Sequence, residues 1–108
     1  MDLIYQKARY SVDDTLAILT YTEDPETGLE PWGYATVNVS AYYHFPLTDD
    51  LVILPKYKMT KEFYETVVND IVEKELSEVQ VGYGVAQMVR LKPDWEQHVR
   101  MLPEEEYN

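Results

Sequence analysis

The sequence predicts an α+β fold in which an antiparallel or mixed sheet of about five strands carries one main amphipathic helix on one face. Two observations lead to this fold class. Several short segments alternate apolar and polar side chains with a period of two, whereas residues 61–76 repeat apolar side chains at i and i+4. With 108 residues, 45% of them hydrophobic, the chain suffices for one core. We therefore expect a single domain over residues 1–102 and a solvated acidic tail over residues 103–108.

Two strands are predicted at the start of the chain, over residues 3–11 and 15–22, because both segments alternate. Asp13 and Asp14 stand between them and favour a turn, so we expect the two strands to form a hairpin. Residues 23–31 follow. They are dense in turn-forming residues and in acids, and they predict an exposed loop.

Two further strands and the helix are predicted in the middle of the chain. Residues 33–40 alternate again, and the continuous apolar run 51–54, stopped by Pro55, is typical of a short buried strand. Thr60 is a suitable N-cap for a helix over residues 61–76, which carries a broad apolar stripe.

The last strand is predicted over residues 79–91, with a bend at Gly82 and Gly84. Residues 93–102 then predict a short C-terminal helix, which Asp94 caps and which docks on the sheet. Because most connections between the predicted strands are short, hairpin pairing is favoured over crossover connections.

Net charge is the strongest global feature of the chain. Twenty acidic residues against nine basic ones leave a formal net charge of −11 and a pI near 4.4. Such an excess repels phosphate, and the basic residues are scattered, so we expect no direct binding to nucleic acid or to a membrane. The natural partner is a basic protein. The alternative is that acidity serves only solubility, because a charge magnitude of roughly 2–8 already suits small domains.

The expected location follows from what the chain lacks. No apolar run approaches the roughly 20 residues of a membrane-spanning helix, and the first residues carry no signal-peptide pattern. The chain has no cysteine, which suits a reducing compartment. We expect a soluble, cytoplasmic protein.

No sequence pattern is typical of catalysis. The pattern Gly82-Tyr83-Gly84 lacks the third glycine of a dinucleotide fingerprint, which argues against a nucleotide site. His44 and His98 have no partner at i+3 or i+4, so we expect no metal site. We predict no catalytic residues and no cofactor. A small enzyme that uses buried carboxylates stays open as a third hypothesis behind two binding functions.

Acidic residues gather in two places that predict a partner-binding surface. One face of the predicted helix carries carboxylates at axial rises of about 4.5 and 12 Å, comparable to one and two phosphate steps, so it can imitate a nucleic-acid backbone. The plainer interpretation is that a surface helix is polar outside. An aromatic segment before Pro46 is a further candidate. The candidate residues are Glu62, Glu65, Asn69, Asp70 and Glu73 on the helix, Glu23, Asp24, Glu26 and Glu30 in the loop, and Tyr42 and Tyr43 in the aromatic segment.

Four features in order span residues 34–91: a strand at Tyr34-Ala35-Thr36-Val37-Asn38-Val39, a short strand at Leu51-Val52, a helix opened by Thr60-Lys61-Glu62, and a strand from Gly82-Tyr83-Gly84 to Leu91. In this layout the chain resembles small accessory proteins of plasmids, phages and conjugative elements of Gram-positive bacteria. The aromatic segment and the region of Trp95 depart from the pattern. Proteins of this class include CRISPR inhibitors and antirestriction factors, several of them acidic mimics of nucleic acid. The resemblance implies an inhibitor of a host defence nuclease in the bacterial cytoplasm.

These observations predict a non-catalytic inhibitor of a bacterial defence nuclease, with a Cas9-type CRISPR effector as the leading target, whose basic DNA groove the acidic surface blocks. The alternative is a small adaptor or assembly module of a mobile element, with no nucleic-acid mimicry. Such a module can be homodimeric through a strand edge or through the aromatic segment. The first function predicts binding that weakens with salt, and the second predicts binding that charge reversal does not change.

Overall fold

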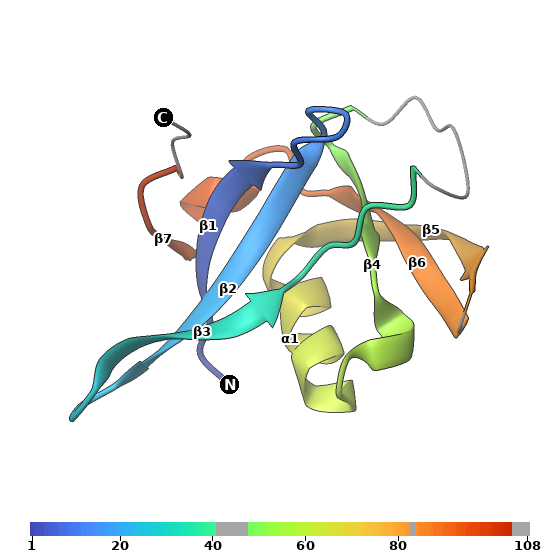
Figure 1. The fold of residues 1–108 in the computed structure, drawn as a ribbon. Coiled ribbons are helices and arrows are strands. Elements are labelled where there is room, and N and C mark those ends of the chain that lie inside the picture. Colours follow the sequence, from blue (N-terminus) through green and yellow to red (C-terminus); the bar gives the residue numbers. More distant parts are fainter. Residues whose placement is uncertain (41–47, 83, 105–108) are drawn as a thin grey trace.

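The computed structural model describes residues 1–40, 48–82 and 84–104 (Figure 1). Within these residues the α+β class is confirmed, but the strands number seven and form two sheets instead of one sheet of about five. In chain order the elements are β1 (Ile4–Arg9), β2 (Leu16–Asp24), β3 (Gly28–Tyr34), β4 (Leu51–Leu54), the 3-10 turn η1 (Lys56–Lys58), α1 (Lys61–Ile71), β5 (Val72–Val81), β6 (Gly84–Leu91), the 3-10 turn η2 (Trp95–Gln97) and β7 (Arg100–Met101).

The first sheet has the strand order β3-β2-β1-β7. β1 and β2 pair antiparallel from Ile4↔Tyr21 to Arg9↔Leu16, which confirms the predicted hairpin. Asp13 shapes its turn by accepting hydrogen bonds from the backbone N–H and the hydroxyl of Thr15. The short strand β7 pairs with β1 in parallel. It forms the edge of the sheet opposite to β3.

The second sheet has the order β4-β6-β5 and is antiparallel. Residues 35–39 connect the two sheets. The backbone N–H of Ala35 donates to Ile18 in β2 at 2.8 Å, and that of Val37 donates to Ile53 in β4 at 2.9 Å. The strand predicted over residues 33–40 is therefore wrong beyond Tyr34, because the segment bonds first to one sheet and then to the other.

One core joins both sheets to α1. The helix begins as predicted at Thr60, whose Oγ1 accepts a hydrogen bond from the N–H of Phe63 at 3.1 Å. Phe63, Val67 and Ile71 recur at i+4, and all three are buried. They pack in a core with side chains from both sheets, which include Tyr5 of β1, Leu16 and Ile18 of β2, Val52 and Leu54 of β4, and Val89 and Leu91 of β6.

The helix ends at Ile71, five residues before the predicted end at Leu76. Val72 pairs with Leu91 and starts β5, and the backbone N–H of Lys92 donates to the carbonyl of Ile71 at 2.9 Å. Residues 72–76 have spacing compatible with a helix, but Val72, Lys74 and Glu75 pair with β6 instead. Tertiary pairing thus overrides local propensity here.

Three other sequence predictions need correction. Residues 23–31 are not a loop, because β2 and β3 continue through most of them as an exposed hairpin. Residues 79–91 form the end of β5 and all of β6 rather than one strand. The C-terminal helix is only the 3-10 turn η2 followed by β7, and Asp94 makes no side-chain cap hydrogen bond.

Two features of the C-terminal region do match the expectation of docking on the sheet. Trp95 is buried and packs edge-on against Tyr5, with ring centroids 6.3 Å apart. The backbone N–H of Leu102 donates to the carbonyl of Tyr5 at 2.8 Å. In the described part of the chain, no helix has the length and apolarity to cross a membrane.

Candidate partner-binding surface

Four of the predicted acids lie on an arm, which we define as residues 22–31: the end of β2, the start of β3 and the turn between them (Figure 1). Asp24 builds the turn, because its Oδ1 accepts hydrogen bonds from the backbone N–H groups of Glu26 at 2.7 Å and Thr27 at 3.2 Å. These donors hold the pKa of the Asp24 carboxyl below its ordinary value. Gly28 follows with φ +84°, which favours glycine. The turn is therefore encoded locally.

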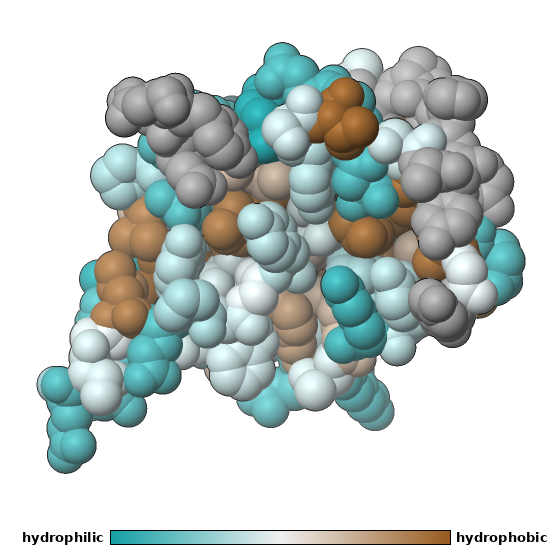
Figure 2. Space-filling model, in the orientation of Figure 1, coloured by the Kyte–Doolittle hydropathy of each residue, from teal (hydrophilic) through white to brown (hydrophobic). Residues whose placement is uncertain are grey.

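The arm concentrates negative charge on a narrow ribbon. All of its acidic side chains are exposed, and hydrophilic residues cover its tip at the lower left of Figure 2. The strand register places Asp24 and Glu30 on the same face as diagonal neighbours, about 7–8 Å apart. Glu23 forms an ion pair with Arg100 of β7 at 2.9 Å. Arg100 of the body thus compensates the charge of Glu23, and the arm as a whole remains acidic.

The acids predicted for one helical face are divided between two elements. Glu62, Glu65 and Asn69 are exposed on α1, but Glu73 lies in β5, so the predicted row is interrupted after Asn69. Glu62 lies 3.7 Å from the N-terminal ammonium, and Glu65 lies 4.0 Å from Lys61. Cations of the protein itself therefore partly neutralise this face.

Asp70 stands apart from the other helix acids because it is only half-exposed. Its Oδ2 accepts a hydrogen bond of 2.7 Å from the hydroxyl of Tyr5, which is fully buried. Burial and this hydrogen bond raise the pKa of Tyr5 far above its ordinary value, so the hydroxyl stays protonated and remains the donor. Asp70 thus links α1 to β1 and acts as a structural residue.

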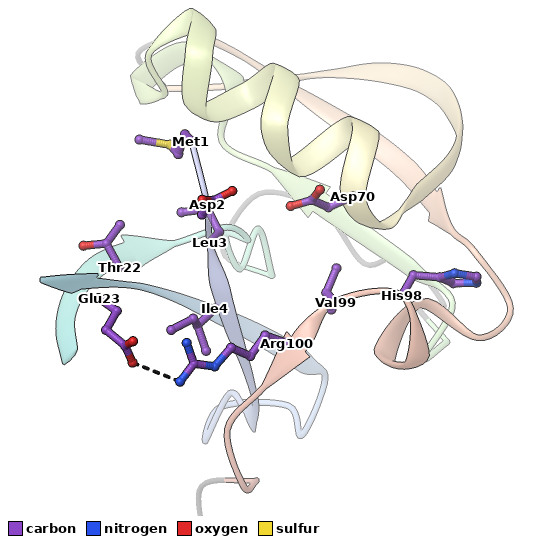
Figure 3. A pocket seen from close by; sticks show the side chains of 10 residues that line it. All are labelled: Met1, Asp2, Leu3, Ile4, Thr22, Glu23, Asp70, His98, Val99 and Arg100. Carbon is purple, nitrogen blue, oxygen red and sulfur yellow. Dashed lines mark hydrogen bonds and ion pairs between the residues drawn. The ribbon is translucent and has the colours of Figure 1, made fainter. Parts of the chain in front are cut away.

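Asp70 also lines a pocket of about 710 Å³ between the N-terminal residues, the end of α1 and β7 (Figure 3). The ion pair of Glu23 and Arg100 closes one side of the pocket, whereas the imidazole of His98 points away from it (Figure 3). The described residues contain no group of three His, Cys, Asp or Glu side chains arranged to hold a metal ion. Two predicted residues, Glu23 and Asp70, therefore meet at a pocket that the sequence did not indicate.

A second concave surface was also missed by sequence reasoning. It lies between β3 and the start of α1, has a volume of about 440 Å³, and is mainly apolar. We call it the aromatic groove. The signal that could have found it is the segment 56–59, where two lysines alternate with Tyr57 and Met59. The side chains and backbone that line the groove come from Trp32, Gly33, Tyr34, Pro55, Lys58, Met59, Thr60 and Phe63.

The remaining candidates, Tyr42 and Tyr43, lie outside the described residues. Comparison of the chain with protein-family models, with curated protein sequences and with solved structures gave no match.

Proposed function

We propose that the protein is a non-catalytic inhibitor of a bacterial defence nuclease, with a Cas9-type CRISPR effector as the leading target, and that its acidic arm occupies the basic channel in which the nuclease binds nucleic acid. The observation that supports this proposal is the arm itself. Four carboxylates lie within eight consecutive positions, residues 23–30, on a hairpin that projects from the body (Figure 1). A two-stranded ribbon is narrower than a nucleic-acid duplex and can enter a channel that admits one.

The arm supports this function better than the helix face does. The helix acids Glu62 and Glu65 each have a cation of the same chain within 4.0 Å, and Asp70 is engaged by Tyr5. On the arm, Glu23 is paired with Arg100, Asp24 and Glu26 lie at the turn, and Glu30 lies opposite Thr22, nearer the body. Basic residues of a nuclease channel can therefore meet Asp24 and Glu26 at the turn of the arm without first displacing Arg100 from Glu23.

A cleavage assay with a purified Cas9-type effector, its guide RNA and target DNA tests the proposal. The arm variant Glu26→Lys/Glu30→Lys should raise the concentration needed for half-inhibition at least about 10-fold, because like charges then face each other in the channel. The matched control is Glu62→Lys/Glu65→Lys, which makes the same charge change on α1 and should keep most of the inhibition.

Salt dependence supplies an independent readout of the same assay. Because counterion release and screening govern contacts between charged surfaces, inhibition should weaken as salt rises from about 50 to 200 mM. Inhibition by the arm variant that equals the wild type would rule out the arm as the binding element. No inhibition by the wild type in a panel of Cas and restriction nucleases would overturn the proposed function altogether.

The adaptor function has one specific observation in its favour, the half-exposed aromatic residues Trp32 and Tyr34 of the aromatic groove. The free edge of β5 does not favour it. That strand carries two bulges, one between Val72 and Lys74 and one between Glu75 and Glu78, and charged side chains dominate residues 73–78. Bulges and charges are the features with which proteins protect an edge strand from pairing.

A further inference from the structure

The aromatic groove holds large apolar side chains in fixed positions while leaving them half-exposed. Trp32 is 46% exposed and packs edge-on against Phe63, with ring centroids 6.2 Å apart. Tyr34 is 52% exposed and stacks on Tyr10 at 6.4 Å. Side chains that are already held by neighbours lose little freedom on binding, so such positions are suited to anchor a partner.

Three lysines lie in or beside the groove, although the protein as a whole is acidic. Lys56, Lys58 and Lys61 are three of the nine basic residues, and they fall within six positions of the chain. All three are exposed. Lys58 lines the groove itself, whereas Lys56 and Lys61 line a neighbouring hollow that shares Met59 with the groove and also contains Glu65. An occupant that complements this surface must therefore combine negative charge with an apolar side chain.

The arm of a second copy has this combination. Leu29 is 45% exposed near its tip, between Glu26 and Glu30, and Asp24 adds a third carboxylate. At physiological salt the screening length is about 8 Å, so the tip of an arm responds to the nearby lysines more than to the distant charges of the body. The net charge of −11 on each copy does not prevent this local contact.

The arm itself also benefits from a covering partner. All seven residues of β3 are exposed, including Leu29, Trp32 and Tyr34. A two-stranded ribbon without a further layer is only marginally stable in water. Seating the arm against an apolar groove would remove Leu29 from water and stabilise the ribbon.

We propose that two copies of this chain associate by placing the arm of each copy in the aromatic groove of the other. β3 runs from the arm to the body (Figure 1) and carries both surfaces, the arm at its start and groove residues at its end. A single two-fold axis can therefore satisfy both contacts at once. This inference goes beyond the proposed function. In the dimer the arm of each copy is covered by the groove of the other and cannot reach a nuclease. Inhibition therefore requires dissociation of the dimer.

Two charge-reversed variants test the proposal by sedimentation velocity over a range of protein concentrations. The arm-reversed variant replaces Glu23, Glu26 and Glu30 by Lys and keeps Asp24, which caps the turn. The groove-reversed variant replaces Lys56, Lys58 and Lys61 by Glu. Each variant alone should dimerise at least about 10-fold more weakly than the wild type, because its arm and its groove then carry charge of the same sign.

An equimolar mixture of the two variants should recover the dimer. The basic arm of one variant then meets the acidic groove of the other, and the acidic arm meets the basic groove. This recovery also shows that both variants are folded. A wild-type protein that stays monomeric at about 1 mM would overturn the proposal, and so would variants that dimerise as the wild type does or a mixture that stays monomeric.

Trp32→Ala supplies a test that leaves the charges unchanged. It should weaken self-association at least about 10-fold, because interface anchors of this kind carry much of the binding energy. The nuclease assay separates this proposal from the proposed function. The groove-reversed variant should lose self-association and keep inhibition, whereas the arm-reversed variant should lose both.

Discussion

The two halves of β2 share one strand but have opposite surroundings. Leu16 and Ile18, in the first half, are buried against α1 and the second sheet. Glu23 and Asp24, at the end of the same strand, are exposed on the arm. The first half is held by burial of apolar surface, and the second by antiparallel pairing and a capped turn. Regular backbone pairing therefore persists where no core supports it, and the side chains of that region are exposed to solvent.

The largest effect is expected in the buried half of β2. Ile18→Ala should lower the free energy of unfolding by about 3 kcal/mol, since it removes buried methyl groups and leaves a cavity. Leu29→Ala on the arm is the matched control and should change stability by less than about 0.5 kcal/mol. Urea denaturation followed by circular dichroism measures both. A similar loss in the two variants would contradict the division of β2 into a buried half and an exposed half.

The next effect is expected at Gly84, where β6 passes close to η1. A Cβ added at Gly84 in β6 would lie 2.6 Å from the Cβ of Tyr57 in η1, which is too close for any side chain. Gly84→Ala should therefore displace η1 and cost about 2 kcal/mol of stability. Gly84→Ala combined with Tyr57→Gly should recover most of this loss, because the second change removes the clashing atom. If Gly84→Ala has the same Tm as the wild type, β6 and η1 lie further apart than described.

A smaller effect with a distinctive pH dependence is expected at Tyr5. Tyr5→Phe leaves the Asp70 carboxylate without its donor and should cost about 1–2 kcal/mol at pH 7. Burial raises the pKa of Tyr5 in the folded protein, whereas the unfolded chain ionises near pH 10. The stability that Tyr5 contributes is therefore fully present below about pH 10 and is lost as the pH rises further.

Urea denaturation measured at several pH values from 7 to 11 tests this pH dependence. The wild type should lose its advantage over Tyr5→Phe above about pH 10, because only the wild type carries this hydroxyl. Burial also raises the pKa of Tyr10, to about 12, so the variant keeps part of the alkaline destabilisation. A constant difference between the two proteins across this range would show that Tyr5 is not buried as described.

The smallest effect on stability is expected on the arm. Glu26→Lys/Glu30→Lys should change the free energy of unfolding by at most about 0.5 kcal/mol, because both side chains are exposed and distant from the core. Thermal unfolding at low and high salt measures this change. Substantial unfolding of the variant would mean that the arm contributes to the stability of the fold. Unfolding, and not the reversed charge, would then explain a loss of inhibition.

The helix illustrates how far local sequence determines the fold. Thr60 and the i+4 recurrence of Phe63 and Val67 predict where α1 begins and which side it buries, and both predictions are confirmed. Its end at Ile71 could not be predicted, because residues 72–76 have no local signal that outweighs a helix. The end of the helix is determined by the pairing of Val72 with Leu91, which lies 19 positions further along the chain.

The candidate site divides in the same way. The sequence alone determined that the protein is strongly acidic, that Glu23, Asp24, Glu26 and Glu30 are exposed, and that one helix begins at Thr60, because composition, turn chemistry and capping act within a few residues. Only the tertiary structure decided that these acids stand on a projecting hairpin and that Asp70 is held by Tyr5. It also brought Trp32 beside Phe63 to form the aromatic groove. These arrangements depend on pairing and packing between segments distant in the chain, which no local pattern encodes.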